Sequence, residues 1–381
     1  MVKAVVDFVT NICDHHSQRL FELLDGRFEL TFYFTGAGER YRGDKSRSVT
    51  GNFKYRNVGG FPVLPRVRVS PGILVLWRRK QDVFIKTVDD RFALPAVFFM
   101  ARLKRTPLVL WTGIWQHPAT RFHRLSWGAT RFLYARADAL VVYGEHVKRY
   151  LVSQGVETGK IFCAPHAVDN GRFNQPVDEA AVLRLRQELD AQGKRVVLFV
   201  GRLEQCKGLD FLIEAVGLLE RPDVLVVLIG NGPIKNACEA LAAQKGVTVR
   251  FVDYVPNPRL ALYYAIADVF VLPSVTTDDF KEPWGLVVNE AMNQGCPVIV
   301  TEAVGAGAGG LVKDGINGFV VPEKDHRALA AGLAKILTDR SLRARLSANA
   351  RAEISKWTPE KMADGFEAAV HYALRKKGKD P

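Results

Sequence analysis

The stretch Arg195-Val-Val-Leu-Phe-Val-Gly201-Arg-Leu-Glu-Gln-Cys-Lys207-Gly208 joins a continuous apolar run to a glycine turn that carries two cations. An apolar run of this length that ends at glycine predicts a buried strand, and the pattern that follows predicts a helix from about Asp210. A buried strand leading into a helix is the repeating unit of a parallel, helix-covered sheet. Arg202 and Lys207 leave the same strand end, where a guanidinium fork and a lysine charge together suit a diphosphate.

A second stretch, Glu282-Pro-Trp-Gly-Leu-Val-Val-Asn-Glu290, places two carboxylates around a predicted helix start. Its proline and glycine mark a loop, and helical spacing begins at Leu286, so we expect Glu282 in the loop and Glu290 on the helix. The free N–H groups of Gly285, Leu286 and Val287 would then form an anion site between two hydrogen-bond acceptors. Two solvated helix-end charges would have the same spacing, so the neighbouring motifs decide between these readings.

A third stretch supplies another strand end. The predicted strand from Val224 to Ile229 runs into Gly230-Asn-Gly232, where missing side chains let the backbone approach a ligand. Because the carboxyl ends of parallel strands meet at one edge of a sheet, we expect all three stretches to converge on one anion.

Four further motifs accompany these stretches. They are Pro165-His-Ala-Val-Asp169-Asn-Gly-Arg-Phe173, Tyr264-Ala-Ile-Ala-Asp268-Val-Phe-Val-Leu-Pro-Ser274, Gly295-Cys-Pro-Val-Ile299 and Asp314-Gly-Ile-Asn-Gly318. Together the motifs resemble the family 4 retaining glycosyltransferases, from roughly Lys160 to Trp357. The resemblance implies the GT-B architecture, in which two Rossmann-like domains face each other.

The resemblance also implies roles for single residues. Arg202 and Lys207 would neutralise the donor diphosphate, Glu290 would hold ribose hydroxyls and Glu282 would face the donor sugar. The expected donor-binding residues are Gly201, Arg202, Lys207, Gly230, Gly232, Tyr254, Val255, Glu282, Gly285, Leu286, Val287 and Glu290, of which Tyr254 and Val255 would contact the base through the backbone. Pro283 and Trp284 replace the commoner Gly-Phe pair, and we expect Trp284 to form an aromatic wall near the sugar.

His117 follows a predicted strand and a glycine, at the position where members of this family place a histidine near the donor sugar. A lone histidine is more often structural, and His123 and His146 are close in the sequence. With that alternative open, the expected catalytic residues are His117, Glu282, Arg202 and Lys207.

Length and alternation predict two domains. A chain of 381 residues with 48% hydrophobic composition is long enough for two cores, and strand-like runs alternate with helical patterns throughout. We predict an acceptor-side domain over residues 1–165 and a nucleotide-sugar domain over 166–358. The resemblance implies that the final helix, from Pro359 to Arg375, crosses back, so that residues 359–381 join the first domain.

The net charge of +13 is confined to the first domain, because Lys and Arg outnumber acids 26 to 13 through Pro165 and equal them, 27 to 27, beyond it. A polyanion such as nucleic acid and an anionic membrane surface would both fit. Basic residues alternate here with large apolar ones, which favours the membrane, although a basic surface over core aromatics stays open. The expected acceptor or membrane contacts are Arg19, Arg102, Lys104, Arg105, Arg121, Phe122 and Trp127, and we expect no nucleic-acid partner.

Other classes of protein fit the sequence less well. The five cysteines are scattered without metal-ligand spacing, which indicates a reducing compartment and no metal site. The start of the chain lacks the apolar core of a signal peptide, and the apolar run from Phe92 to Ala101 is about half of the ~20 residues that a spanning helix needs. We therefore expect a cytoplasmic protein, peripheral on the inner face of the membrane.

A dinucleotide fingerprint is matched by Gly305-Ala-Gly-Ala-Gly-Gly310, but only a few residues separate it from Gly318, too few for the helix that such a fingerprint opens. We instead expect this run to let the backbone approach the donor sugar. The sequence thus predicts a retaining, metal-independent transferase. It would move a sugar from a nucleotide diphosphate donor to a lipid-linked saccharide or polyisoprenoid-type acceptor in polysaccharide or glycolipid biosynthesis, without a cofactor. The alternatives are a nucleotide-sugar epimerase of the same fold and a catalytically silent, membrane-associated scaffold.

Overall fold

The computed structural model describes residues 3–36, 51–64 and 67–379 of the chain. The chain divides into two compact units. Unit 1 consists of Met1–His117, Arg121–His166 and Pro359–Pro381, and unit 2 consists of Pro118–Thr120 and Ala167–Thr358. Each unit contains a parallel sheet with helices packed on it, which confirms the predicted α/β class.

Unit 1 is built on a seven-stranded sheet in the order β3-β2-β1-β6-β7-β8-β9. Its strands, all paired in parallel, are β1 (Val5–Thr10), β2 (Glu29–Phe34), β3 (Tyr55–Asn57), β6 (Val83–Thr87), β7 (Leu108–Thr112), β8 (Ala139–Val142) and β9 (Ile161–Cys163). A separate antiparallel pair consists of β4 (Phe61–Leu64) and β5 (Val67–Val69). The helices are α1 (Ser17–Arg27), the 3₁₀ helix η2 (Pro71–Arg78), α2 (Ala93–Leu103), α3 (Arg121–Arg136), α4 (Glu145–Ser153), the 3₁₀ helix η3 (Thr158–Lys160) and α14 (Pro359–Arg375).

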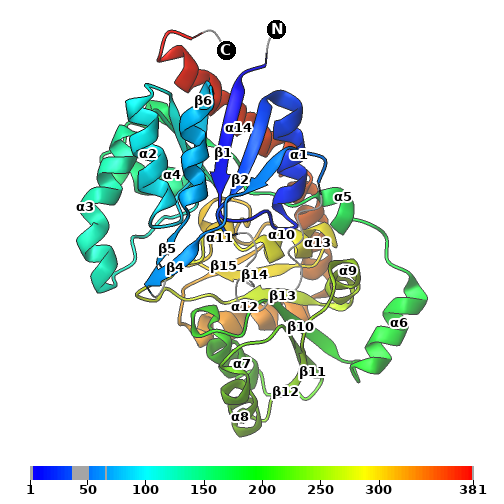
Figure 1. The fold of residues 1–381 in the computed structure, drawn as a ribbon. Coiled ribbons are helices and arrows are strands. Elements are labelled where there is room, and N and C mark those ends of the chain that lie inside the picture. Colours follow the sequence, from blue (N-terminus) through cyan, green and yellow to red (C-terminus); the bar gives the residue numbers. More distant parts are fainter. Residues whose placement is uncertain (1–2, 37–50, 65–66, 380–381) are drawn as a thin grey trace. The chain divides into compact units, whose positions relative to one another are not determined.

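Apolar side chains cover both faces of this sheet. Phe8, Phe21 and Phe32 belong to a cluster on the face that α1 and α14 cover, and a second cluster lies under α2 and η2. Figure 1 shows α14, in red, lying against the blue strands and α1. Gly365 allows this close approach, because a Cβ atom there would collide with the backbone of Cys163 and Ala164. The final helix therefore returns to the first unit, as predicted.

Among the described residues, no helix is both long and apolar enough to cross a bilayer.

Unit 2 is built on a six-stranded parallel sheet in the order β12-β11-β10-β13-β14-β15. The strands are β10 (Arg195–Val200), β11 (Val224–Ile229), β12 (Thr248–Val252), β13 (Val269–Leu272), β14 (Val298–Thr301) and β15 (Gly318–Val321). The helices are α5 (Asn170–Phe173), α6 (Glu179–Glu188), the 3₁₀ helix η4 (Gln205–Lys207), α7 (Leu209–Gly217), α8 (Lys235–Lys245), α9 (Asn257–Ile266), α10 (Leu286–Asn293), α11 (Gly305–Ala308), α12 (His326–Thr338) and α13 (Arg340–Ile354). The strands predicted at 195–200 and 224–229 are confirmed, and the helix expected from about Asp210 begins one residue earlier.

Two glycine turns bring the strand ends of unit 2 together. Gly208, between η4 and α7, has a φ of 62°, and a Cβ atom there would collide with the carbonyl oxygen of Pro273 beyond β13. Gly230, after β11, has a φ of 132° and lies so close to the Gly201 carbonyl that a side chain could not fit. The loops after β10, β11 and β13 are therefore packed on one another at one edge of the sheet.

Candidate functional site

A buried ion pair lies at the carboxyl ends of β10 and β13. Lys207 Nζ donates a hydrogen bond to Glu282 Oε2, and Ser274 Oγ donates to the same oxygen at 3.0 Å. The two charged side chains are only 11% and 9% exposed, and the Lys207 ammonium also lies 5.4 Å from the centre of the Phe280 ring. The structure thus brings together two predicted site residues that are 75 positions apart in the sequence.

Arg202 lies beside this pair in the chain but is more exposed. Its guanidinium forms an ion pair with Glu204, and 38% of its side chain is accessible. The loop that carries it is fixed to the next loop, because Leu203 N donates to the Asn231 carbonyl at 3.0 Å and Gly232 packs against the Leu203 carbonyl. In the described structure, Gly230 and Gly232 let two loops pack closely, whereas the sequence assigned them to the approach of a ligand.

The start of α10 lies next to Glu282 along the chain. Gly285 has a φ of 91° and directly precedes the helix, and as a glycine it offers no side chain to cap the first N–H groups. The loop before α10 is hydrogen-bonded to the segment that starts at Gly305. Gly305 N donates to the Glu282 carbonyl at 3.1 Å, and Ala306 N donates to the Trp284 carbonyl at 2.8 Å. The glycine run from Gly305 therefore supports the loop that carries Glu282. The run forms only the four-residue helix α11, which agrees with the rejection of a dinucleotide fingerprint.

Glu290 lies on α10 with its carboxyl group 2% exposed. The Tyr264 hydroxyl donates a hydrogen bond of 2.7 Å to Glu290 Oε2. Burial raises the pKa of Glu290 to about 7, although the Tyr264 bond opposes this rise. Sequence reasoning quoted Tyr264 and Ser274 only as parts of a motif and gave neither a role in the site. Their polar groups, like that of Asp268, interrupt an otherwise apolar motif, which is the signal that could have found them.

The expectation that Trp284 forms an aromatic wall near the sugar is wrong. Its side chain is 1% exposed, and its Nε1 donates a hydrogen bond of 2.9 Å to Asn289 Oδ1. Its ring centre lies 5.2 Å from that of Trp357. The indole fills the interior of unit 2, where both its ring and its N–H find partners, and it leaves no face open to a ligand.

The two residues expected near the base follow β12. Tyr254 is 68% exposed, whereas Val255 is buried. That their backbone groups contact the base of the donor stays a prediction.

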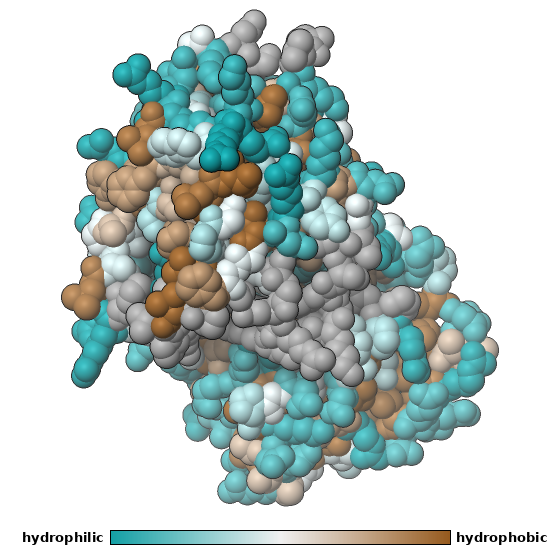
Figure 2. All heavy atoms as spheres, viewed as in Figure 1, coloured by the Kyte–Doolittle hydropathy of each residue, from teal (hydrophilic) through white to brown (hydrophobic). Residues whose placement is uncertain are grey.

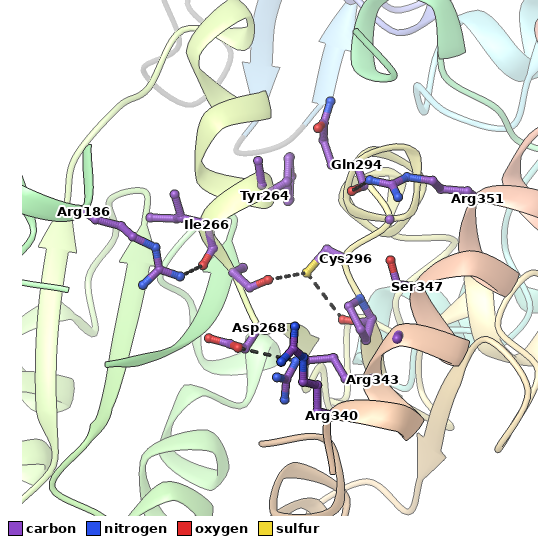
Figure 3. A pocket seen from close by; sticks show the side chains of 15 residues that line it. Arg186, Tyr264, Ile266, Asp268, Gln294, Cys296, Arg340, Arg343, Ser347 and Arg351 are labelled. Atoms are coloured by element: carbon purple, nitrogen blue, oxygen red, sulfur yellow. Dashed lines mark hydrogen bonds and ion pairs between the residues drawn. The ribbon is translucent and has the colours of Figure 1, made fainter. Parts of the chain in front are cut away.

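A surface pocket of about 350 Å³ lies elsewhere in unit 2 (Figure 3). It is lined by Asp268 and Cys296, which precede β13 and β14, and by arginines of α6 and α13. Arg186 donates to the Ile266 carbonyl at 2.8 Å, and Arg343 donates to the Ile336 carbonyl at 2.8 Å and pairs with Asp268. The pocket lies at the amino ends of these strands, away from the predicted donor residues at their carboxyl ends, and these arginines satisfy main-chain carbonyls.

In unit 1, His117 makes local contacts. Its Nε2 donates to the His123 carbonyl at 2.7 Å, and its ring centre lies 4.1 Å from that of Trp127. The Nε2 atom therefore carries a proton in this arrangement. Both Trp127 and His117 are half-buried, so Trp127 covers His117 with part of its ring.

Several of the predicted acceptor or membrane cations form bonds inside unit 1. Arg19 pairs with Glu360 at 3.4 Å, and Arg102 donates to the Arg136 carbonyl and pairs with Asp138 at 3.6 Å. Lys104 donates to the carbonyls that end η2, at 3.0 Å for Leu76, 3.2 Å for Trp77 and 2.5 Å for Arg79. Arg105 and Arg121 are exposed, and the side chain of Phe122 lies outside the described part of the structure.

Sequence comparisons match the second unit. Residues 183–353 match the family model described as Glycosyl transferases group 1. The D-inositol 3-phosphate glycosyltransferase of Xylanimonas cellulosilytica is 38% identical over 227 residues, which are 57% of this chain and 53% of that protein. The GDP-mannose-dependent alpha-(1-6)-phosphatidylinositol monomannoside mannosyltransferase of Mycolicibacterium smegmatis is 29% identical over 234 residues, 58% of this chain and 60% of that protein. The chain spans about half the length of the curated relatives it matches.

Comparison of structures covers both units. The crystal structure of Anabaena HepE, in complex with UDP and glucose, matches with a TM-score of 0.77 and 18% sequence identity, over 96% of this chain and 99% of that chain. A likeness at this identity supports the fold, while the matched family segment contains Arg202, Lys207, Glu282 and Glu290. Residues 183–353 thus match the glycosyl transferases group 1 family, and the chain has the GT-B fold.

Proposed function

We propose that the chain transfers a sugar from a nucleotide diphosphate donor, with retention of anomeric configuration, to a lipid-linked saccharide or polyisoprenoid-type acceptor. The observation that carries the proposal is the buried Lys207–Glu282 pair beside the start of α10, where the capping position is Gly285. A cation, free helix N–H groups and a carboxylate at one strand edge suit a diphosphate that is attached to a sugar. The relatives support this choice by their names, which include an inositol phosphate glycosyltransferase and a GDP-mannose-dependent mannosyltransferase.

The pair suggests how the donor would be received. Without a donor, Lys207 and Glu282 compensate each other's buried charge. A bound diphosphate offers Lys207 a stronger anionic partner, and we propose that Glu282 then accepts hydrogen bonds from sugar hydroxyls. Ser274 continues to donate to Glu282 and keeps the carboxylate in position.

Catalysis would come mainly from stabilising the leaving diphosphate. As the bond to the sugar breaks, negative charge grows on the diphosphate oxygens, next to Lys207, Arg202 and the N–H groups at the start of α10. These groups are held by the packed loops before the reaction begins, so little reorganisation is needed. This supply of positive charge is the reason that we propose a metal-independent reaction.

Glu290 would hold the ribose of the donor. A ribose hydroxyl would donate to its carboxyl group, which also accepts the hydrogen bond of Tyr264. Because the pKa of Glu290 is raised to about 7, the carboxyl group must lose its proton to act as a full acceptor. We further propose that His117 lies near the donor sugar during transfer, held by its Nε2 bond to the α3 backbone.

We propose that unit 1 binds an anionic membrane through a basic apolar face formed by η2, α2 and α3. Its exposed apolar residues are Leu74, Trp77, Phe99, Leu103, Leu125 and Phe132, and its exposed cations are Arg78, Arg105, Arg124 and Arg131. The three helices are neighbours, since η2 packs on α2 and the rings of Phe98 and Phe132 lie 5.7 Å apart. Figure 2 shows hydrophobic residues exposed among hydrophilic ones over this part of unit 1. Each cation near an anionic leaflet contributes ~1 kcal/mol, and apolar side chains add to the attachment.

Release of nucleoside diphosphate from a panel of UDP-sugars, GDP-sugars and ADP-sugars tests the activity, with an extract of membrane lipids as the acceptor source. We expect one donor class to react, and its rate to rise when lipid extract is added. A Lys207→Ala variant is the matched control and should lose about ten- to a hundredfold in rate. Binding of a nucleotide without release of a sugar product would favour the silent scaffold, and isomerisation of the donor sugar would favour the epimerase.

A further inference from the structure

Asn170 lies near the two places where the chain enters and leaves the long segment of unit 2, Ala167–Thr358. The chain enters unit 2 after His166 and leaves it after Thr358. The Asn170 side chain donates from Nδ2 to the Ile354 carbonyl at 3.1 Å and to the Trp357 carbonyl at 3.0 Å. One amide group therefore ties the entering segment to the leaving segment, and all of these bonds lie inside unit 2.

The same amide is bonded to α10. Asn293 Nδ2 donates to Asn170 Oδ1 at 2.9 Å and to the Asn289 carbonyl, one turn earlier in α10, also at 2.9 Å. Asn293 is buried, so these bonds are largely shielded from water. Gln294, directly after the helix, donates to the carbonyls of Phe173 and Gln175. The carboxyl end of α10 is thus bonded to the segment by which the chain enters unit 2.

A second link starts at the opposite end of α10. Trp284, just before the helix, donates to Asn289 and contacts the ring of Trp357, which is the last residue but one before the chain leaves unit 2. Trp357 is fixed in turn by a bond of 3.3 Å from its Nε1 to Glu353 Oε1. Both ends of α10 are therefore connected to the crossing segments, here taken as residues 167–175 and 354–358.

We propose that Asn170, Asn289, Asn293, Trp284 and Trp357 form a positioning network for the transfer reaction. The network would couple the donor site at the start of α10 to both crossing segments. This inference rests on the proposed function, because it takes a nucleotide diphosphate as the ligand of α10. Asn289, Asn293 and Trp284 are buried, and Asn170 and Trp357 are half-buried, so we expect them to act through α10 and not by contact with the donor.

The chemistry of the network explains why it would transmit a change. Buried amide groups have directional bonds, and a shift of α10 by a fraction of a bond length weakens several of them together. Apolar contacts would tolerate such a shift, because they have no preferred direction. A small movement of α10 on binding a diphosphate is therefore passed to segments 167–175 and 354–358.

Hydrogen exchange of the full chain with and without UDP or GDP tests the network, together with the kcat and KM of transfer. Nucleotide should slow exchange at residues 285–290 and, by about threefold or more, in both crossing segments. In Asn293→Ala and Asn170→Ala, protection at 285–290 should remain, protection of segment 167–175 should be lost, and protection of segment 354–358 should be weakened, because Trp284 still contacts Trp357. In the same variants kcat should fall about tenfold with nucleotide affinity changed by less than about threefold.

Two further variants separate coupling from general destabilisation. Asn170→Asp keeps the acceptor for Asn293 but loses the donor to Ile354 and Trp357, so only the response of segment 354–358 should weaken. Asn349→Ala removes a comparable bond, 2.8 Å from Nδ2 to the Ile316 carbonyl, and should leave both responses intact.

Two outcomes would overturn the proposal, and they have different meanings. If nucleotide protects residues 285–290 but the crossing segments respond equally in the wild type, Asn170→Ala and Asn293→Ala, the network does not couple them. If neither nucleotide protects residues 285–290 in the wild-type chain, the proposed donor site itself is wrong and the network falls with it.

Discussion

Replacing Lys207 by methionine should destabilise the protein even without a ligand. The substitution leaves Glu282 buried at 9% exposure without its cation, although Ser274 still donates a hydrogen bond to it. Breaking a buried ion pair by removing one partner costs about 3 to 5 kcal/mol, and the low exposure of both side chains leaves little solvent screening to reduce that figure. For a unit of roughly 150 to 250 residues, each kcal/mol lowers the Tm by about 2 to 4 °C, so the Tm of Lys207→Met should fall by at least about 6 °C.

A double variant makes this prediction specific. Lys207→Met together with Glu282→Gln removes both charges while Ser274 can still donate to the glutamine oxygen, so most of the lost stability should return. Transfer should not return, because the diphosphate still lacks its cation. Thermal unfolding followed by circular dichroism measures the first effect, and nucleoside diphosphate release measures the second. A Tm for Lys207→Met within about 1 °C of wild type would refute the buried pair, and a double variant as unstable as the single one would refute charge compensation as its cause.

Three other predictions follow from single contacts. The affinity of the wild type for nucleotide should rise between about pH 6 and about pH 8, because Glu290 ionises near its raised pKa of about 7. The affinity of Glu290→Gln should not change over this range, and calorimetry measures both. The stability of the protein without nucleotide should depend on pH in the opposite direction. The folded state holds the Glu290 proton more tightly than the unfolded state, so the contribution of Glu290 to stability falls as the pH rises from its ordinary pKa of 4.5 to about 7. Trp284→Phe should lower the free energy of unfolding by about 1 to 2 kcal/mol, because the hydrogen bond to Asn289 is lost, and should leave the KM for the donor unchanged. A large change in KM would indicate that Trp284 contacts the donor sugar. Arg105→Glu, Arg124→Glu and added salt should each reduce the fraction of protein that sediments with anionic vesicles. Lys104→Ala should instead lower the Tm, because Lys104 binds the carbonyls that end η2. Equal sedimentation of all variants would contradict the membrane proposal.

The fold could be predicted from the sequence because its signals are local. Apolar runs such as Val224–Ile229 and the glycines that end them specify strands and turns within a few residues, and regular alternation specifies a parallel sheet. The convergence of Arg202, Lys207 and Glu282 on one strand edge followed from that sheet. The direct bond between Lys207 and Glu282 did not, because it depends on how two loops 75 residues apart pack on each other.

The prediction for Trp284 was wrong because the residue was assigned to the surface from its local surroundings. Trp284 lies in a loop with proline and glycine, which indicates exposure, but its ring packs on Trp357 from a distant part of the chain. Arg102 and Lys104 lie in a basic cluster, and the sequence did not indicate that each also binds carbonyls of other elements; their membrane contact stays a prediction. Hydrogen bonds to the main chain of a distant segment leave no trace in a local sequence pattern.

The most direct test of the central claim is the binding of a nucleoside diphosphate at the carboxyl edge of the unit 2 sheet. Thermal unfolding in the presence of UDP, GDP, ADP or TDP, each with its monophosphate as a control, measures this for the wild type and for Lys207→Met. At about 100 times its dissociation constant, one diphosphate should add roughly 2.7 kcal/mol to the stability of the wild type, with a much smaller gain from the monophosphate and from the variant. If no diphosphate stabilises the wild type, or if Lys207→Met gains as much as the wild type does, the site formed by Lys207, Glu282 and α10 is not a donor site.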